Sequence, residues 1–129
     1  MRRARQLKGR VLVVEDEPGV QKFLSRLIST TGAEVEAAST GEEALQALPL
    51  KEDVFLAILD LNLPDASGLD ILDKIRSTHS DLPVILSSGY DESEIPSSLM
   101  EDRHLRFLRK PYQIATFWEA FDSVLSGRS

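Results

Sequence analysis

Acidic side chains follow two apolar segments of this sequence, at the point where each segment ends. Glu15 and Asp16 come directly after residues 11–14, and Asp60 comes directly after residues 54–59. Parallel sheets bind their ligands outside the carboxyl ends of the strands. If the two segments are neighbouring parallel strands, three carboxylates converge there, and they stay ionised together only when a cation compensates their repulsion. A set of oxygen ligands open to water is typical of Mg²⁺.

Two more polar residues follow later apolar segments. Ser88 comes after residues 83–86 and Lys110 after residues 105–108, each with one residue between. The Ser88 hydroxyl could donate a hydrogen bond to a phosphoryl oxygen, and the Lys110 ammonium could place a positive charge near another. With Asp60 as the nucleophile, these groups suit phosphoryl transfer, which depends mainly on positioning and on charge neutralisation.

Each of these residues also has a structural explanation when it is taken alone. Asp60 and Ser88 could be turn residues, Asp16 could cap a helix that begins near Pro18, and Lys110 could be a solvated surface charge. The occurrence of all of them at the ends of successive strands favours the chemical explanation. We therefore predict that Asp60 receives a phosphoryl group.

The elements that must position these residues alternate along the chain. Patterns typical of strands occur at residues 11–14, 33–37, 54–59, 83–86 and 105–108. Apolar residues at helical spacing follow four of the strands, at residues 18–31, 40–48, 67–79 and 114–125, whereas they are sparse in the expected helix at residues 91–103. Thr40 and Ser67 are expected N-caps, and Pro96 predicts a short or distorted fourth helix. Such alternation predicts an α/β domain in which helices cover both faces of a parallel sheet.

The composition indicates one small globular domain. The 129 residues fit a single core, and no apolar run approaches the length needed to span a membrane. A net charge of −6 without clustered basic residues argues against binding to nucleic acid, and we expect no membrane contact. With no cysteine and no signal-peptide pattern, the expected location is the cytoplasm. We expect a flexible lead-in at residues 1–9, one domain at 10–126 and a tail at 127–129.

The combined motifs resemble the receiver domains of bacterial two-component response regulators, from about residue 10 to residue 125. The motifs are Glu15-Asp16, Asp60 followed by Leu63-Pro64 and Gly68, Ser88-Gly89, and Lys110-Pro111. The sequences around Tyr90 and Tyr112 make the chain most similar to receivers attached to hybrid sensor histidine kinases. The resemblance implies a doubly wound (βα)5, flavodoxin-like three-layer sandwich whose five parallel strands have the order 2-1-3-4-5.

The resemblance also implies a phosphorelay function and a Mg²⁺ cofactor. Asp60 would accept a phosphoryl group from a phosphohistidine of a histidine kinase or of a histidine phosphotransfer domain. Asp16 and Asp60 would bind Mg²⁺ together with the backbone carbonyl of Asn62, and Glu15 would act through a coordinated water.

Further residues would read or control the phosphorylated state. By resemblance, Ser88 and Lys110 would hold the phosphoryl oxygens. Phe107 would turn inward when Ser88 moves towards the phosphoryl group, which would reshape the surface of the fourth helix, fifth strand and fifth helix. Alternatively, Phe107 is an ordinary core aromatic. Asn62 and Tyr90 would modulate the reaction, and we expect Tyr90 to shield the acyl phosphate from water.

We therefore expect a signalling switch rather than an enzyme, and the same resemblance allows a homodimer through the fourth helix, fifth strand and fifth helix. Two alternatives remain. The first is a vestigial interaction module that works without phosphate. The second is a small Mg²⁺-dependent phosphatase with an Asp nucleophile. Against the phosphatase, the chain has no second Asp two residues after Asp60 and no insertion that could shape a substrate pocket.

Overall fold

Strands and helices alternate through the whole domain. The computed structural model describes residues 7–50, 52–89 and 96–126. The elements in chain order are β1 (Arg10–Val14), α1 (Pro18–Ser29), β2 (Glu34–Ala38), α2 (Gly41–Ala47), the 3-10 helix η1 (Leu48–Leu50), β3 (Val54–Asp60), α3 (Gly68–Thr78), β4 (Val84–Ser88), α4 (Ser97–Met100), β5 (Leu105–Arg109) and α5 (Ile114–Ser126).

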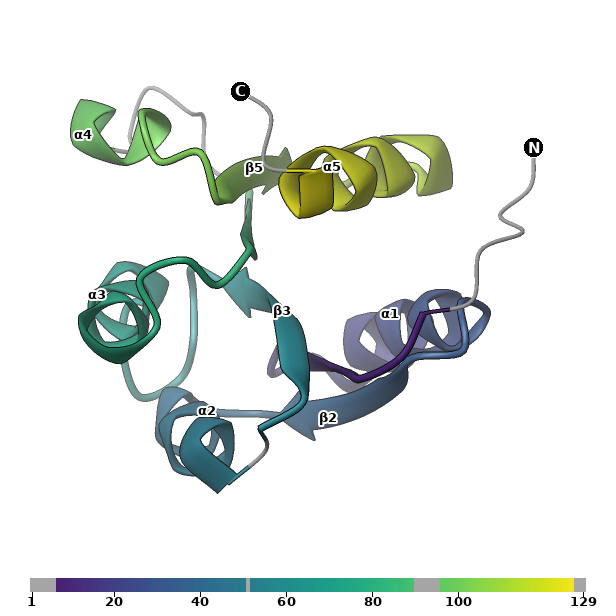
Figure 1. Cartoon of the computed structure of the whole chain (residues 1–129), viewed down its shortest axis with the longest axis horizontal. Coiled ribbons are helices and arrows are strands. Elements are labelled where there is room, and N and C mark those ends of the chain that lie inside the picture. Colours follow the sequence, from purple (N-terminus) through teal and green to yellow (C-terminus); the bar gives the residue numbers. More distant parts are fainter. Residues whose placement is uncertain (1–6, 51, 90–95, 127–129) are drawn as a thin grey trace.

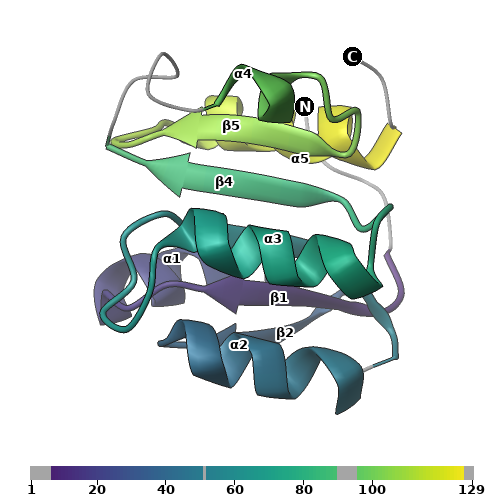
Figure 2. The ribbon, with the colours of Figure 1, turned by 90° about the vertical axis from the view of Figure 1, so that its left-hand side faces the viewer.

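The sheet is parallel and has the order β2-β1-β3-β4-β5. Helices α2 and α3 cover one face, and α1 and α5 cover the other (Figure 1). The arrowheads of β1, β4 and β5 point to the same side in Figure 2, as parallel pairing requires, so their carboxyl ends share one edge. The predicted three-layer α/β fold and its strand order are therefore confirmed.

The central strands are buried on both faces, which explains their continuous apolar runs. In β3, Leu56 and Ile58 pack with α1 and α5, whereas Ala57 and Leu59 pack with α2 and α3. The α5 helix contributes the largest side chains of its layer, because Phe117 and Phe121 are fully buried there. Two apolar cores therefore hold the sheet in place, one on each face.

Polar side chains determine where two of the helices begin. The Thr40 hydroxyl accepts a hydrogen bond from the Glu43 N–H at 3.1 Å, and the Glu43 carboxylate accepts one from the Ser39 N–H at 2.8 Å. The Thr40 contact is the N-cap half of the predicted capping box of α2, whereas the Glu43 carboxylate binds the N–H of the residue before the N-cap. The Ser67 hydroxyl accepts from the Leu69 N–H at 3.2 Å and caps α3. Both predicted N-caps are confirmed.

Several boundaries differ from the sequence prediction by one or two residues, as at α1, which ends at Ser29, and at β4, which extends to Ser88. The second strand lies one residue further along than predicted, and α2 ends at Ala47, where the chain tightens into η1 around Pro49. Pro has no N–H to continue the helical ladder, which accounts for the early end. The described part of the fourth helix is the four-residue α4 that follows Pro96, and the earlier part of that prediction lies outside the described residues.

Residues just before β1 are already attached to the domain. The Leu7 N–H donates to the Thr31 carbonyl at 2.7 Å, and the Leu7 side chain packs against the α1 and α5 core. The Gly9 carbonyl accepts from the Glu34 N–H at 2.9 Å. Part of the segment that the sequence suggests to be a flexible lead-in therefore contacts β2 and the turn before it.

One glycine permits a close approach between α3 and the end of β3. A Cβ on Gly68 would overlap with the Asp60 carbonyl oxygen and would lie 2.6 Å from the Leu61 Cα. The Gly68 N–H also donates to the Leu61 carbonyl at 2.8 Å. The helix therefore starts directly on the backbone of the residue that carries the central carboxylate.

We predict opposite effects for the same substitution at two helix starts. Gly68→Ala should lower the free energy of unfolding by about 1–3 kcal/mol, because the new methyl group overlaps with fixed backbone atoms. Gly19→Ala, in the first turn of α1, is the matched control, since a Cβ there meets nothing within 4 Å. It should raise the free energy by roughly 0.5–1 kcal/mol through helix propensity. Urea unfolding of both variants measures the difference, and equal effects would contradict the close-approach argument.

Candidate functional site

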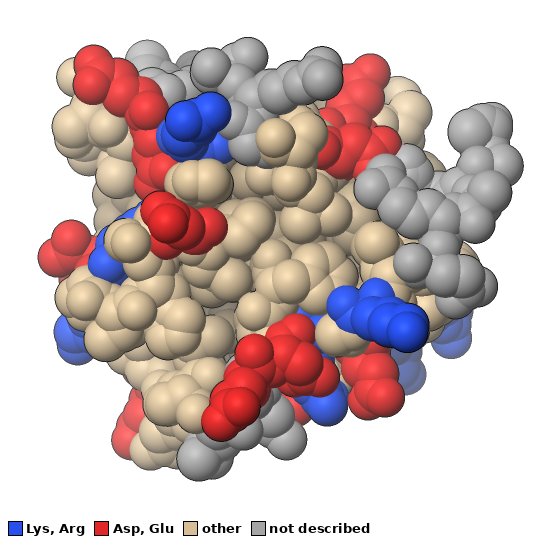
Figure 3. Space-filling model, in the orientation of Figure 1, with Lys and Arg blue, Asp and Glu red and all other residues tan. Residues whose placement is uncertain are grey.

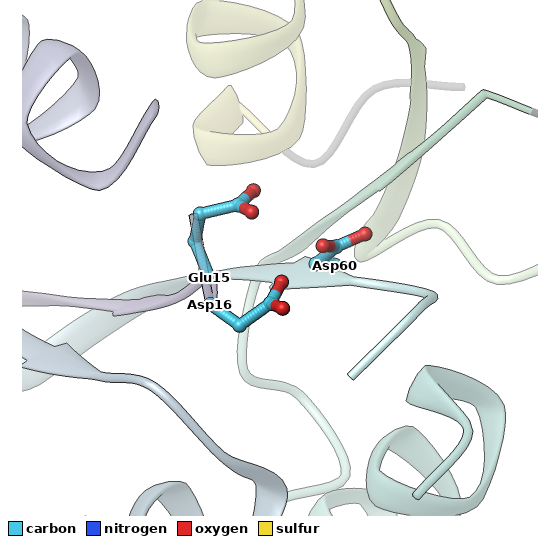
Figure 4. Close-up of side chains that lie close together, drawn as sticks. All are labelled: Glu15, Asp16 and Asp60. Carbon is cyan, nitrogen blue, oxygen red and sulfur yellow. The ribbon is translucent and has the colours of Figure 1, made fainter. Parts of the chain in front are cut away.

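The pairing of the central strands brings the acidic residues together. Val14 of β1 pairs with Leu59 of β3, so the residue after each strand position lies at the same edge. Glu15 and Asp16 follow β1, and Asp60 is the last residue of β3. Figure 4 shows the three carboxylates converging from these two strand ends. Ligand oxygens of the three residues lie within 4.8 Å of one another, as the sequence predicts for a metal site.

The three carboxylates differ in burial. Glu15 is 2% exposed and Asp60 is 4% exposed, whereas Asp16 is open to solvent. Burial, followed by repulsion from Asp60, raises the pKa of Glu15 above its usual value. The Glu17 N–H donates to Glu15 at 3.2 Å and partly offsets this effect. The site therefore holds two buried carboxyl groups that cost free energy when both are ionised.

Lys110 is the cation beside this pair. Its Nζ lies 3.1 Å from Glu15 Oε1 and 3.4 Å from Asp60 Oδ2. Burial lowers the pKa of Lys110, but attraction to Asp60 and Glu15 outweighs that effect and leaves the pKa above its usual value. The backbone places the side chain, because the Lys110 N–H donates to the Ser88 carbonyl at 2.7 Å. Lys110 therefore lies where a phosphoryl group on Asp60 would need a positive charge.

The charges of this cluster fit a divalent cation. Three ionised carboxylates and one ammonium leave a net charge of −2 among these four residues. Mg²⁺ prefers oxygen ligands and keeps several of its waters, which the exposed Asp16 side permits. The donor set therefore suits Mg²⁺ and lacks the nitrogen and sulfur ligands of a typical zinc site.

Asn62 lies next to the cluster at the start of the β3–α3 loop. Its N–H donates to Asp60 Oδ1 at 3.1 Å, and the Leu61 N–H donates to the Ser87 carbonyl at 2.9 Å. These hydrogen bonds orient the Asp60 carboxylate and fix the beginning of the loop. The structure thus brings the Asn62 backbone to the predicted site, while the Asn62 side chain is exposed.

Ser88 and Phe107, the residues of the predicted switch, lie on the face of the sheet opposite to the one on which the Asp60 side chain lies. Phe107 pairs with Leu86 and is partly buried against the α2 and α3 core. Ser88 is fully buried and follows Leu86 by two residues, so strand alternation places it on the same face. Asp60, two residues after Ile58, belongs to the α1 and α5 face. Tyr90 lies outside the described residues.

Two buried hydroxyls beside the site were not predicted from the sequence. Ser87 pairs with Asp60 across the strands, and among the described residues neither the Ser87 hydroxyl nor that of Tyr112 reaches hydrogen-bond geometry with a partner. Burial, then the charges of Glu15 and Asp60, raise the pKa of Tyr112 to about 12, although the nearby Ser87 hydroxyl acts in the opposite direction. Tyr112 is therefore uncharged at neutral pH and lies near the Glu15 and Asp60 carboxylates. A tyrosine after Lys110-Pro111 was the available signal.

Gln21 is a third residue that sequence analysis missed. Its side-chain amide donates to the Glu15 carbonyl at 2.8 Å and to the Ala38 carbonyl at 3.4 Å. These contacts join α1 to the ends of β1 and β2. A polar residue on the inner side of an amphipathic helix gives little indication of such a role, because its partners are backbone carbonyls, which every residue has.

The face shown in Figure 3 carries charged side chains of both signs. On the face shown in Figure 3, acidic and basic side chains are intermixed around the rim, and the basic ones form no continuous patch. Among the helices of the described residues, none has the length and apolar character required to cross a bilayer.

Known proteins contain domains that are similar to this chain in sequence and in structure. The model of the response regulator receiver domain matches residues 11–122. Sensor kinase CckA from Brucella abortus is 34% identical over 105 residues, which are 81% of this chain and 11% of that protein. The chain spans 11% to 48% of the length of three curated relatives that it matches.

Solved structures of receiver domains are also similar to this chain. The receiver domain from the hybrid histidine kinase CckA is 34% identical, with a TM-score of 0.73 and coverage of 91% of this chain and 99% of that one. Response regulator protein TrrA from Thermotoga maritima, in complex with Mg²⁺-BeF, is 30% identical, with a TM-score of 0.77 and coverage of 90% and 98%. The match of the family model over most of the chain, together with these relatives, shows that the chain belongs to the response regulator receiver family, the phosphoacceptor switches of two-component signalling.

Proposed function

We propose that Asp60 is the phosphoacceptor of this receiver and that its donor is a phosphohistidine. The observation that carries this proposal is the contact of Lys110 Nζ with Asp60 Oδ2 at 3.4 Å, beside two further carboxylates. An Asp60 oxygen would form a bond to phosphorus while the P–N bond of the phosphohistidine breaks. The imidazole would leave with the electron pair of that bond. Phosphoryl transfer of this kind depends on positioning and charge neutralisation, which the cluster can supply.

Each polar residue of the site has a part in this proposal. The Lys110 ammonium would leave its present contact with Asp60 Oδ2 and bind a phosphoryl oxygen instead. Asp16, Asp60 and the Asn62 carbonyl would hold Mg²⁺, and Glu15 would act through a water on the ion. When bound, Mg²⁺ would neutralise charge on the carboxylates and on the transferred group. The complex of TrrA with Mg²⁺-BeF supports this assignment by similarity.

We propose that Ser88 and Phe107 transmit the phosphorylated state. Ser88 directly precedes the loop after β4, and its carbonyl holds the Lys110 backbone. A movement of the Ser88 hydroxyl towards a phosphoryl group would change packing beside Leu86, which is the strand partner of Phe107. The partly buried Phe107 ring could then move further inward. Asn62 and Tyr90 would modulate the lifetime of the acyl phosphate.

We also propose a donor, a location and domain boundaries for this chain. A histidine kinase or histidine phosphotransfer domain would be the donor, and the cytoplasm would be the location. A homodimer through α4, β5 and α5 stays a prediction, as does the domain range 10–126. The contacts of Leu7 support a folded boundary slightly before residue 10. We also propose that the chain itself is a phosphoacceptor and does not turn over small phosphate esters.

The first test is the intact mass of the protein after incubation with acetyl phosphate and Mg²⁺. The wild type should gain the mass of one phosphoryl group only when Mg²⁺ is present, and Asp60→Ala should gain none. Lys110→Ala should bind Mg²⁺ but react slowly. Absence of an adduct in the wild type, together with no complex with beryllofluoride, would favour the vestigial module. Turnover of phosphate esters would favour the phosphatase.

A second prediction concerns stability. Mg²⁺ should raise the free energy of unfolding, because it relieves the repulsion between Glu15 and Asp60 in the folded state. At a Mg²⁺ concentration about ten times the Kd, linkage gives about 1.4 kcal/mol. The increase should vanish in Asp60→Ala and persist in Asp73→Ala, since Asp73 is exposed on α3 outside the cluster. Urea unfolding with and without Mg²⁺ measures it. Equal stabilisation of all three proteins would refute a site at Asp60.

A third prediction concerns the donor's docking surface. Phe23 on α1 and Ile114 at the start of α5 are large apolar residues with 39% and 50% exposure, and both helices follow the loops of the site. Phe23→Ser should slow phosphoryl transfer from a histidine kinase or phosphotransfer domain by about tenfold, as expected for an interface anchor. The rate with acetyl phosphate should not change. If both rates fall together, Phe23 acts on the site itself and the docking assignment is wrong.

A further inference from the structure

A carboxylate outside the acidic cluster connects the β3–α3 loop to another helix. Asp65 Oδ1 accepts a hydrogen bond from the Gly41 N–H at 2.9 Å, and Asp65 Oδ2 accepts one from the Glu42 N–H at 3.0 Å. Both donors are the first N–H groups of α2, which have no partner within their own helix. Asp65 therefore caps α2 from a loop that lies 24 residues further along the chain.

The base of this loop is fixed on the sheet. The Leu61 N–H donates to Ser87, the Gly68 N–H donates to the Leu61 carbonyl, and Asn62 forms an isolated bridge with Ser67. The segment between Asn62 and Ser67 is thus a closed turn. Asp65 lies near the tip of that turn, so its two hydrogen bonds attach the tip to α2.

The absence of a side chain at Gly41 permits this attachment. A Cβ on Gly41 would lie 2.6 Å from the Ile71 Cδ1 and 3.5 Å from Asp65 Oδ1. The absence of a side chain at Gly41 therefore allows the start of α2 to approach both α3 and the carboxylate. The hydrogen bond from Gly41 is the main cause of a lowered pKa of Asp65, so the group is ionised at neutral pH. An anion at a helix start also interacts favourably with the helix dipole.

We infer that Asp65 is a positioning residue for the Mg²⁺ site. The contacts at the base of the turn hold Asn62 beside Asp60, and Asp65 would limit the remaining movement of the Asn62 carbonyl by attaching the tip of the turn to α2. This inference rests on the proposed function, because it presupposes a Mg²⁺ site that includes Asn62. It assigns a role in metal binding to a side chain that does not itself contact the acidic cluster.

The test compares three substitutions by calorimetric Mg²⁺ titration of the full chain. Asp65→Ala should weaken Mg²⁺ binding by about tenfold, the lower end of the losses known for residues that orient metal ligands. Asp65→Asn keeps one acceptor oxygen and should weaken Mg²⁺ binding less than Asp65→Ala does. Thr40→Ala is the matched control, since it removes the other side-chain cap of α2 without affecting the turn. Thermal unfolding without Mg²⁺ should show lower stability for both alanine variants.

The outcomes separate this inference from the proposed function. Lower stability of both alanine variants, with weakened Mg²⁺ binding only in the Asp65 variants, supports the positioning role. Unchanged Mg²⁺ affinity in Asp65→Ala shows that Asp65 is only a cap and overturns the inference while the Mg²⁺ site stands. Equal loss of affinity in Thr40→Ala also overturns it, because α2 as a whole would then be responsible. A wild type that does not bind Mg²⁺ overturns the proposed site and the inference with it.

Discussion

The repulsion between Glu15 and Asp60 is the constraint to which the rest of the structure is adapted. Parallel pairing of β1 with β3 forces the two carboxylates to the same edge, and both are almost fully buried. Lys110 offsets part of their charge through contacts of 3.1 and 3.4 Å. Two apolar cores on opposite faces of the sheet supply the stability that lets the domain keep this unfavourable group. A cation at the site would therefore reduce a repulsion that Lys110 offsets only in part.

The residues of the site and of the proposed switch lie on different faces of the sheet. Asp60, Ser87 and Tyr112 belong to the layer of α1 and α5, whereas Leu86 and Phe107 belong to the layer of α2 and α3. Ser88, at the end of β4, lies on the same face as Leu86 by strand alternation and is fully buried. In the proposed switch, a change at the carboxylates would reach Phe107 through this end of β4.

Most of the fold could be predicted because its signals are local. Continuous apolar runs identified the buried strands, and Thr40 and Ser67 marked two helix starts through contacts within four residues. The strand order was less accessible, since it followed from resemblance and no local pattern encodes it. The convergence of Glu15, Asp16 and Asp60 could be predicted once the strands were taken as parallel neighbours. The residues that support the site could not be predicted. Asp65 accepts hydrogen bonds from backbone N–H groups and Gln21 donates to backbone carbonyls, and backbone partners leave no trace in the sequence.

The close contact between Gly68 and the Asp60 backbone has a consequence for how this chain can vary. Since α3 starts directly on β3, the turn from Leu61 to Ser67 acts as a spacer of fixed length between two rigid bodies. An inserted or deleted residue there would lift α3 from the sheet or pull the Asp60 carboxylate out of line. Leu61 and Leu63 of this turn are buried in the core, and Ser67 caps α3, so its side chains are constrained as well. The turn therefore lacks the tolerance of insertions and deletions that is usual for surface loops.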